Sequence, residues 1–144
     1  MPGIVVGVDG SEHSRRALEW AAKEAAFRET PLTVLAVHAV AIGGFGINPI
    51  VYPEDEAARE KVRAAAQKLT DDVLAGGAKP PTVTVTAVNG VPAEELIKAS
   101  QDADMVVVGS RGTGGFARLL IGSVSSQVAA HAHSPVVVIR HDGA

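Results

Sequence analysis

The residues with the clearest capacity for chemistry form the pattern G-x-x-G-x9-G-S in the second half of the chain. Gly109 comes directly after the apolar run of residues 105–108, Gly112 stands three positions later, and Gly122-Ser123 follows Gly112 after nine intervening residues. Glycine turns at the carboxyl end of a buried parallel strand expose main-chain N–H groups, and helix N-termini gather at the same edge. Two such turns predict a site for an anionic ligand such as a nucleotide phosphate.

The residues that surround these glycines strengthen the prediction. Gly114 and Gly115 extend the first turn with more glycine than one turn requires. The second turn continues as Ser123-Val124-Ser125, where a helix N-terminus would present hydroxyls and amides to a phosphate. We therefore favour phosphate binding over a purely structural loop.

The first turn also carries Ser110 and Arg111, and Arg118 follows in the linker. Either arginine can offset phosphate charge, as can Arg15 or Arg16 near the start of the chain. For any single arginine, however, a solvated surface position is the more common role.

Two segments in the first half of the chain are candidates for the other end of a nucleotide. Asp9-Gly10 ends the first apolar run, and the sequence leaves two interpretations of Asp9 open. It is either a turn or cap residue, or a contact to an adenine or ribose edge. Val37 ends the second apolar run, where its main chain can meet a base edge while its side chain lies in the core.

Several other chemistries are excluded or weakened by composition. The chain has no cysteine, which excludes disulfides, thiolate metal sites and cysteine nucleophiles. A net charge of −3 gives no electrostatic footprint for nucleic acid or an anionic membrane. His131 and His133 are two residues apart and do not share a helix face, so they do not predict a metal site. His38 follows the second run as a lone histidine, and no residue is assigned a catalytic role.

Sequence motifs narrow the function further. The chain contains neither the P-loop pattern nor the G-x-S-x-G elbow of serine hydrolases. A dinucleotide pattern fits residues 112–117, but no acidic residue stands about 20 positions further on, so that match is weak.

Five apolar runs separated by helical patterns must position these residues. The runs are mostly β-branched, as expected for strands that are buried on both faces, and they cover residues 4–8, 32–37, 83–88, 105–108 and 136–139. The third run alternates threonine with valine, which predicts a strand at a sheet edge. Four helices are expected, from Ser11 or Ser14 to about 28, from 53 to about 75, from 92 to about 100, and from about 116 or 122 to 131.

The βαβαβαβαβ alternation predicts an α/β fold, a doubly wound five-stranded parallel sheet of order 3-2-1-4-5 with helices on both faces. Residues 1–144 then form a single domain, and Asp9 lies beside Gly109 at the topological switch point. Residues 30–53 carry no charge but hold too many prolines and glycines for a membrane helix. No signal peptide is evident, so a cytoplasmic location is expected.

Taken together, the residues resemble the universal stress protein family, specifically its ATP-binding branch. The resemblance rests on the complete glycine pattern and on its flanks, which span the chain. These are residues 4–11 (IVVGVDGS), 102–112 (DADMVVVGSRG), 122–128 (GSVSSQV) and 134–139 (SPVVVI).

The resemblance implies a role for each matching position. Asp9 and the main chain of Val37 would contact adenine, and Gly109 and Gly112 would hold ribose and phosphate. Gly122, Ser123 and Ser125 would bind the phosphate chain, often with Mg²⁺ or Mn²⁺. The full set of candidate cofactor-binding residues is Asp9, Gly10, Val37, Gly109, Ser110, Arg111, Gly112, Gly114, Gly115, Gly122, Ser123, Val124 and Ser125.

The resemblance also implies a cytoplasmic homodimer that pairs through residues 136–139, while residues 43–50 lie where the family varies. We expect an ATP-binding stress-response or signalling module that changes partners with nucleotide occupancy. One alternative is a slow ATPase or nucleotide-dependent transferase that uses Asp9 and a metal. The other is an ATP-independent dimeric interaction module whose glycines are structural.

Overall fold

The computed structural model of the chain describes residues 3–39, 56–110 and 123–140. Strands and helices alternate through these residues, in the order β1 (Ile4–Val8), α1 (Glu12–Arg28), β2 (Leu32–Ala39), α2 (Glu56–Leu74), β3 (Val83–Gly90), α3 (Pro92–Ala99), β4 (Met105–Gly109), α4 (Ser123–His131) and β5 (Val136–Ile139). All strand pairs are parallel, and the sheet order is β3-β2-β1-β4-β5. The predicted fold class and strand order are therefore confirmed.

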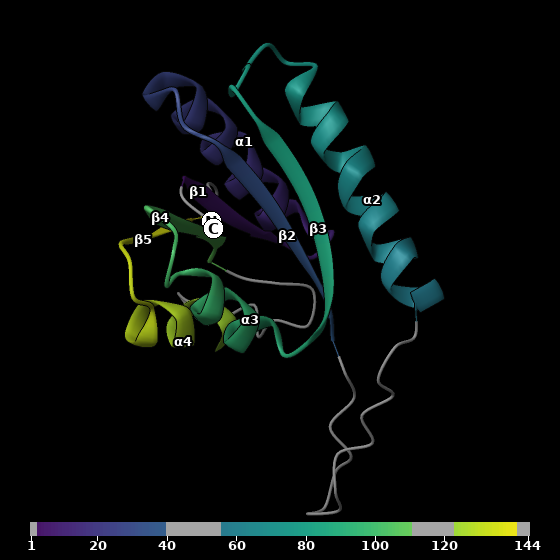
Figure 1. The fold of residues 1–144 in the computed structure, drawn as a ribbon, viewed down its shortest axis with the longest axis vertical. Coiled ribbons are helices and arrows are strands. Elements are labelled where there is room, and N and C mark those ends of the chain that lie inside the picture. Colours follow the sequence, from purple (N-terminus) through teal and green to yellow (C-terminus); the bar gives the residue numbers. More distant parts are fainter. Residues whose placement is uncertain (1–2, 40–55, 111–122, 141–144) are drawn as a thin grey trace, which may run out of the picture.

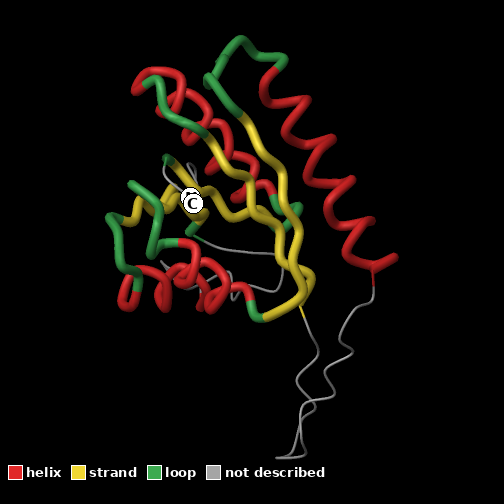
Figure 2. The backbone as a smooth tube through the Cα atoms, viewed as in Figure 1, coloured by secondary structure: helices red, strands yellow, loops and turns green. Residues whose placement is uncertain are grey.

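The sheet lies between two layers of helices (Figures 1 and 2). One hydrophobic cluster joins one face of the sheet to α1 and α2, and a second joins the other face to α3 and α4. The central strands are buried on both faces, because neighbouring Val106 and Val107 point to opposite sides and both are 0% exposed. Their β-branched side chains suit this two-sided burial.

Helix α1 approaches the sheet closely because its buried face is rich in alanine. Four alanines, Ala17, Ala21, Ala22 and Ala25, are fully buried there. The helix begins after Ser11, whose side chain accepts a hydrogen bond from the N–H of Ser14. This selects Ser11 over Ser14 as the N-cap.

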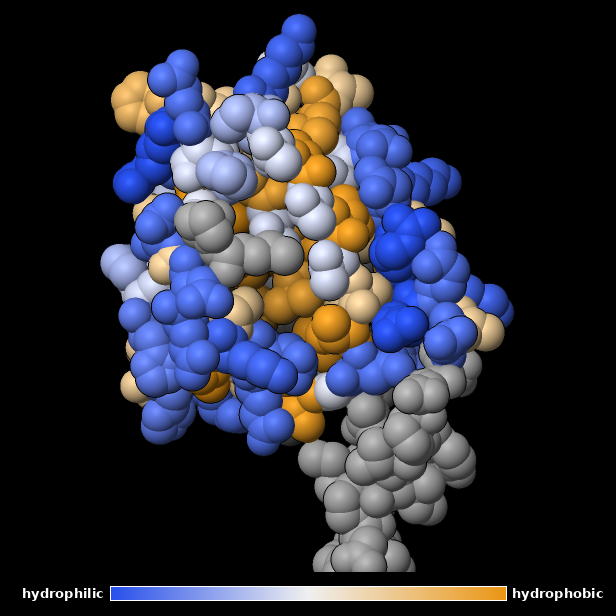
Figure 3. Space-filling view, in the orientation of Figure 1, coloured by the Kyte–Doolittle hydropathy of each residue, from blue (hydrophilic) through white to orange (hydrophobic). Residues whose placement is uncertain are grey.

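The two edges of the sheet are β3 and β5. Thr84 is exposed while the other residues of β3 are partly buried, in agreement with the edge position predicted from the alternating run. Figure 3 shows a band of apolar surface down the middle of this view, bordered by hydrophilic side chains on both sides.

Three strands are longer than the sequence predicts. β2 and β3 each continue for two residues, because His38 pairs with Asn89 and Ala39 pairs with Gly90. Val37 therefore does not end its strand, and His38 lies inside β2, which corrects both sequence assignments. Gly109 is the last residue of β4 and pairs with Ile139.

Some sequence-based boundaries lie outside the described residues. The expected start of the second helix at residue 53 and the earlier start of the fourth at residue 116 are among them. Within the described part of the chain, no helix has both the length and the apolar character needed to cross a membrane.

Candidate functional site

The candidate site lies at the carboxyl ends of β1 and β4, which are neighbouring strands. Residues 4–6 of β1 pair with residues 105–107 of β4, so the turns that follow both strands emerge at one edge. The chain reverses its direction of winding between these strands, and ligands of open α/β sheets bind at such a point. The predicted proximity of the Asp9 and Gly109 turns is confirmed.

The turn after β1 is organised by its own side chains. Asp9 Oδ1 accepts a hydrogen bond from the Ser11 N–H at 2.9 Å, and Ser14 Oγ accepts one from the Asp9 N–H at 3.2 Å. Gly10 has a φ of 84°, which is strained for residues with a side chain. Asp9 therefore shapes the turn, and its side chain is exposed at the strand end.

The first turn of α1 packs directly against the end of β4. A side chain built at Gly109 would place its Cβ 2.8 Å from the carbonyl oxygen of His13 and 3.1 Å from His13 Cβ. Glycine is thus required at position 109 by helix packing, independently of any ligand. The first turn of α1 therefore covers Gly109 on that side, and a ligand there would meet the His13 turn before it reached Gly109.

The N-terminus of α4 is joined to the same strand end from the other side of the sheet. Ser125 Oγ donates to the carbonyl oxygen of Ser110 at 3.3 Å, and the Ser110 N–H donates to the carbonyl of Ile139 at 2.9 Å. Ser110 and Ser125 are each 2% exposed. The Ser110 amide is therefore already used within the sheet, whereas Ser123 is exposed at the first position of α4.

This placement gives α4 the geometry of an anion site. The first N–H groups of a helix have no acceptor within the helix, and the helix dipole makes this end positive. Here that end is fixed to β4 by Ser125, beside the turn of Asp9. Val124 packs partly against the cluster under α4, which orients the first turn.

The remaining predicted residues lie in different surroundings. Val37 is partly buried against the cluster that contains Leu35, and its register partner is Val88. Its side chain belongs to the core, as the sequence analysis expects. Several predicted residues lie outside the described part of the chain, namely Arg111, Gly112, Gly114, Gly115, Arg118 and Gly122, together with residues 43–50.

The metal-ligand chemistry and the resolved pKa shifts concern only the residues that the structure describes. No cluster of three or more His, Cys, Asp or Glu side chains suited to a metal ion occurs among the residues that the structure describes. A hydrogen bond from Arg63 lowers the pKa of Glu60 and raises the pKa of Arg63 itself. Both belong to an exposed pair on α2, three residues apart.

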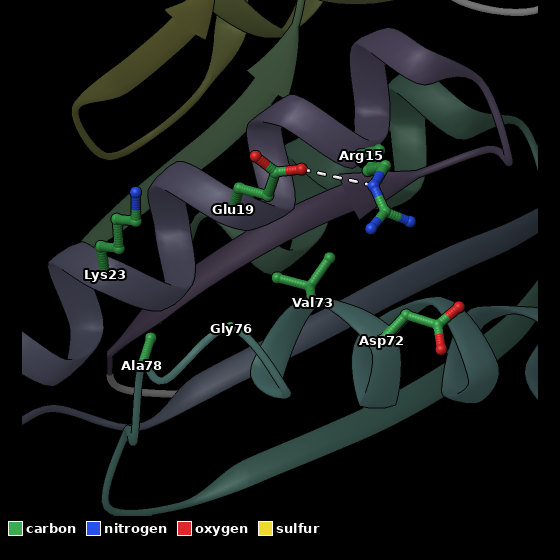
Figure 4. Close-up of a pocket in the computed structure, with 7 residues that line it drawn as sticks. All are labelled: Arg15, Glu19, Lys23, Asp72, Val73, Gly76 and Ala78. Atoms are coloured by element: carbon green, nitrogen blue, oxygen red, sulfur yellow. Dashed lines mark ion pairs between the residues drawn. The ribbon is translucent and has the colours of Figure 1, made fainter.

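A hollow of about 220 Å³ lies between α1 and the carboxyl end of α2 (Figure 4). Arg15, Glu19 and Lys23 line it from α1, and Asp72 and Val73 from α2. Arg15 pairs with Glu19 at 3.3 Å, and the acidic and basic side chains balance in number. The hollow is smaller than the roughly 300–1,000 Å³ typical of small-molecule sites, so it is the weaker candidate.

Sequence reasoning missed His13 as a residue of the site. The histidines it singled out were His38, His131 and His133, and the last two are exposed near the carboxyl end of α4. The signal for His13 is its place four residues after Asp9, in the first turn of the helix that follows the switch-point strand.

A doubly wound α/β domain with glycine turns at its switch point defines the class of protein. The model of the universal stress protein family matches residues 2–140. A universal stress protein of Mycolicibacterium smegmatis is 39% identical over 143 residues, which cover 97% of this chain and 48% of that protein. The chain belongs to the universal stress protein family, and it spans about half the length of the curated relatives it matches.

Solved structures give the same fold, two of them with an adenine nucleotide. A universal stress protein in complex with cAMP has a TM-score of 0.67 and 26% identity, covering 96% of this chain and 95% of its own. The Archaeoglobus fulgidus universal stress protein in complex with dAMP has a TM-score of 0.63 and 26% identity, covering 96% and 98%. Some relatives of this chain therefore bind adenine nucleotides.

Proposed function

We propose that this chain binds ATP at the carboxyl ends of β1 and β4, as a member of the ATP-binding branch of its family. The main support for the proposal is that the N-termini of α1 and α4 both lie at the carboxyl end of β4. The first turn of α1 packs on Gly109, and Ser125 at the start of α4 bonds to Ser110. The positive ends of both helix dipoles therefore lie near the carboxyl end of β4.

The proposed roles follow the sequence pattern. Asp9 and the main chain of Val37 take the adenine end, Gly109 and Gly112 take ribose and phosphate, and the α4 N-terminus takes the phosphate chain. The other members of the candidate set, Gly10, Ser110, Arg111, Gly114, Gly115 and Val124, shape or border the site. Support comes from the adenine nucleotides named for two structural relatives.

Oxygen ligands at this edge of the sheet suit a hard cation that accompanies the nucleotide. The Ser123 hydroxyl, which belongs to the proposed phosphate end, is exposed at the start of α4. Mg²⁺ binds through one or two protein oxygens together with substrate phosphates, and Mn²⁺ suits the same ligands. The cation would neutralise phosphate charge, while the chain's own groups orient the nucleotide.

Two measurements test the proposal. One is isothermal titration calorimetry with ATP, and the other is mass spectrometry of any nucleotide that co-purifies with the protein. Gly122→Val should abolish ATP binding and leave the circular dichroism spectrum unchanged, because the side chain would occupy phosphate space. Thr84→Val, an exposed change on β3, is the control and should bind ATP normally. Unchanged affinity in Gly122→Val would contradict the site assignment.

We propose a binding module rather than an enzyme, acting in stress response or signalling in the cytoplasm. Single-turnover hydrolysis of labelled ATP separates it from the ATPase or transferase alternative. A chemical step at ordinary kinase rates, roughly 1–100 per second, would favour the enzyme. A complete lack of nucleotide binding would favour the ATP-independent module.

We further propose a homodimer that pairs through β5. This edge strand is wholly apolar, yet each of its four residues is only partly buried. Val137 packs toward the α1 side and Val138 toward the α4 side, which leaves the outer edge of the strand available for pairing. Sedimentation velocity should show a dimer that Val138→Lys dissociates and that Thr84→Lys, on the opposite edge strand, does not. A monomeric wild-type protein would contradict this assignment.

A further inference from the structure

We propose that the imidazole of His13 contacts the phosphates of the bound nucleotide and makes ATP affinity depend on its protonation. This inference rests on the proposed function, because it assigns a further residue to the same site. The proposed ligand is a nucleotide whose phosphate chain is ionised.

The position of His13 is fixed by main-chain packing. Its carbonyl carbon and oxygen lie 2.9 and 2.8 Å from the point where a side chain at Gly109 would begin, and its Cβ lies 3.1 Å away. The imidazole is attached to that Cβ, so the ring is held beside the end of β4. A flexible loop could not hold it there, but the first turn of a capped helix can.

The turn that carries His13 is itself rigidly connected to Asp9. Ser11 Oγ accepts from the Ser14 N–H at 3.1 Å, and Ser14 Oγ donates to the Ser11 carbonyl at 2.9 Å. The same Ser14 Oγ accepts from the Asp9 N–H. Asp9, the N-cap and His13 are therefore held together, and His13 packs on Gly109, which the proposed function assigns to ribose and phosphate.

Of the side chains named in this paragraph, the imidazole of His13 is the type that changes its charge near neutral pH. β1, β4 and β5 contribute no charged side chain, and the charged residues nearest to His13 along the chain are Glu12, Arg15, Arg16 and Asp9. Arg140 directly follows Ile139, the register partner of Gly109. Carboxylates and guanidinium groups keep their charge between pH 6 and 8, whereas an imidazole ordinarily titrates in this range.

Titration calorimetry with MgATP at pH 6.0 and 8.0 tests the proposal, with magnesium in excess to keep the triphosphate ionised. We expect the wild-type protein to bind about three- to tenfold more tightly at pH 6.0, because a contact with phosphate favours the charged imidazole. His13→Gln should bind MgATP with less than a twofold difference between the two pH values. His131→Gln, an exposed change at the far end of α4, should behave as wild type.

A second readout comes from the histidine ring protons in NMR spectra. MgATP should raise the titration midpoint of one histidine, and His13→Gln should remove that signal. The inference is overturned if His13→Gln keeps the wild-type pH dependence, or if it weakens binding equally at both pH values. In those cases ATP still binds and the proposed function stands. If the wild-type protein binds no adenine nucleotide at either pH, the proposed function and this inference both fail.

Discussion

Replacing Gly109 with alanine should destabilise the fold, because the first turn of α1 occupies the space of the added methyl group. The new Cβ would lie 2.8 Å from the His13 carbonyl oxygen, about 0.6 Å inside the 3.4 Å limit of ordinary contact. The obstacle is helix main chain, which cannot rotate aside as a side chain can. The helix or the strand end must therefore shift.

Forced overpacking of this kind costs about 1–3 kcal/mol. Alanine also lowers the conformational entropy of the unfolded chain, which stabilises the fold by roughly 0.4–1 kcal/mol. We therefore expect the free energy of unfolding to fall by about 1–2 kcal/mol in total. With a urea m-value of about 1–3 kcal/mol/M, the unfolding midpoint should fall by roughly 0.3–2 M. Fluorescence of Trp20, the single tryptophan, reports the transition, since it packs on the core from α1 itself.

Gly7→Ala provides the matched control for this prediction. A Cβ at Gly7 would also be crowded, at 2.9 Å, but its neighbour is Cδ1 of Leu96, the end of a flexible side chain. Gly7→Ala should therefore cost less than Gly109→Ala, and it should leave ATP affinity unchanged. A Gly109→Ala midpoint that equals wild type, or that falls no further than that of Gly7→Ala, would refute the packing argument.

Three further predictions concern single hydrogen-bonded groups. Ser11→Ala removes the N-cap of α1 and should cost about 1 kcal/mol in urea unfolding. Ser125→Ala leaves the buried Ser110 carbonyl without its side-chain donor and should cost about 1 kcal/mol; an unchanged midpoint would show that this bond adds nothing. Arg63→Gln should raise the lowered pKa of Glu60 toward its ordinary value, as followed by NMR titration, because the hydrogen bond that holds the carboxylate ionised is lost. A Glu60 pKa that does not move would contradict that cause.

The strand order could be predicted because it follows from alternation and the handedness of crossovers. Runs rich in valine predict strands buried on both faces, and Val106 and Val107 lie on opposite faces as expected. The meeting of the Asp9 and Gly109 turns follows from the same topology. These features depend on pattern, which the sequence carries directly.

Other features depend on distances that no pattern encodes. β2 and β3 extend through His38 and Asn89 because these two residues pair with each other in the sheet. Neither residue favours a strand by itself. The packing of His13 on Gly109 depends on how closely α1 approaches the sheet, which the buried alanines set. The sequence explains Gly109 as a ligand contact, whereas the structure adds a reason that needs no ligand.

We propose that an adenine nucleotide binds where β1 and β4 end. The most direct test is a ¹H–¹⁵N NMR titration of the chain with MgATP. We predict that the largest shift changes fall on residues 9–14, 109–110 and 123–125, which border that edge of the sheet. An absence of change, or changes concentrated on Arg15, Glu19, Lys23 and Asp72 in the hollow between α1 and α2, would contradict the account.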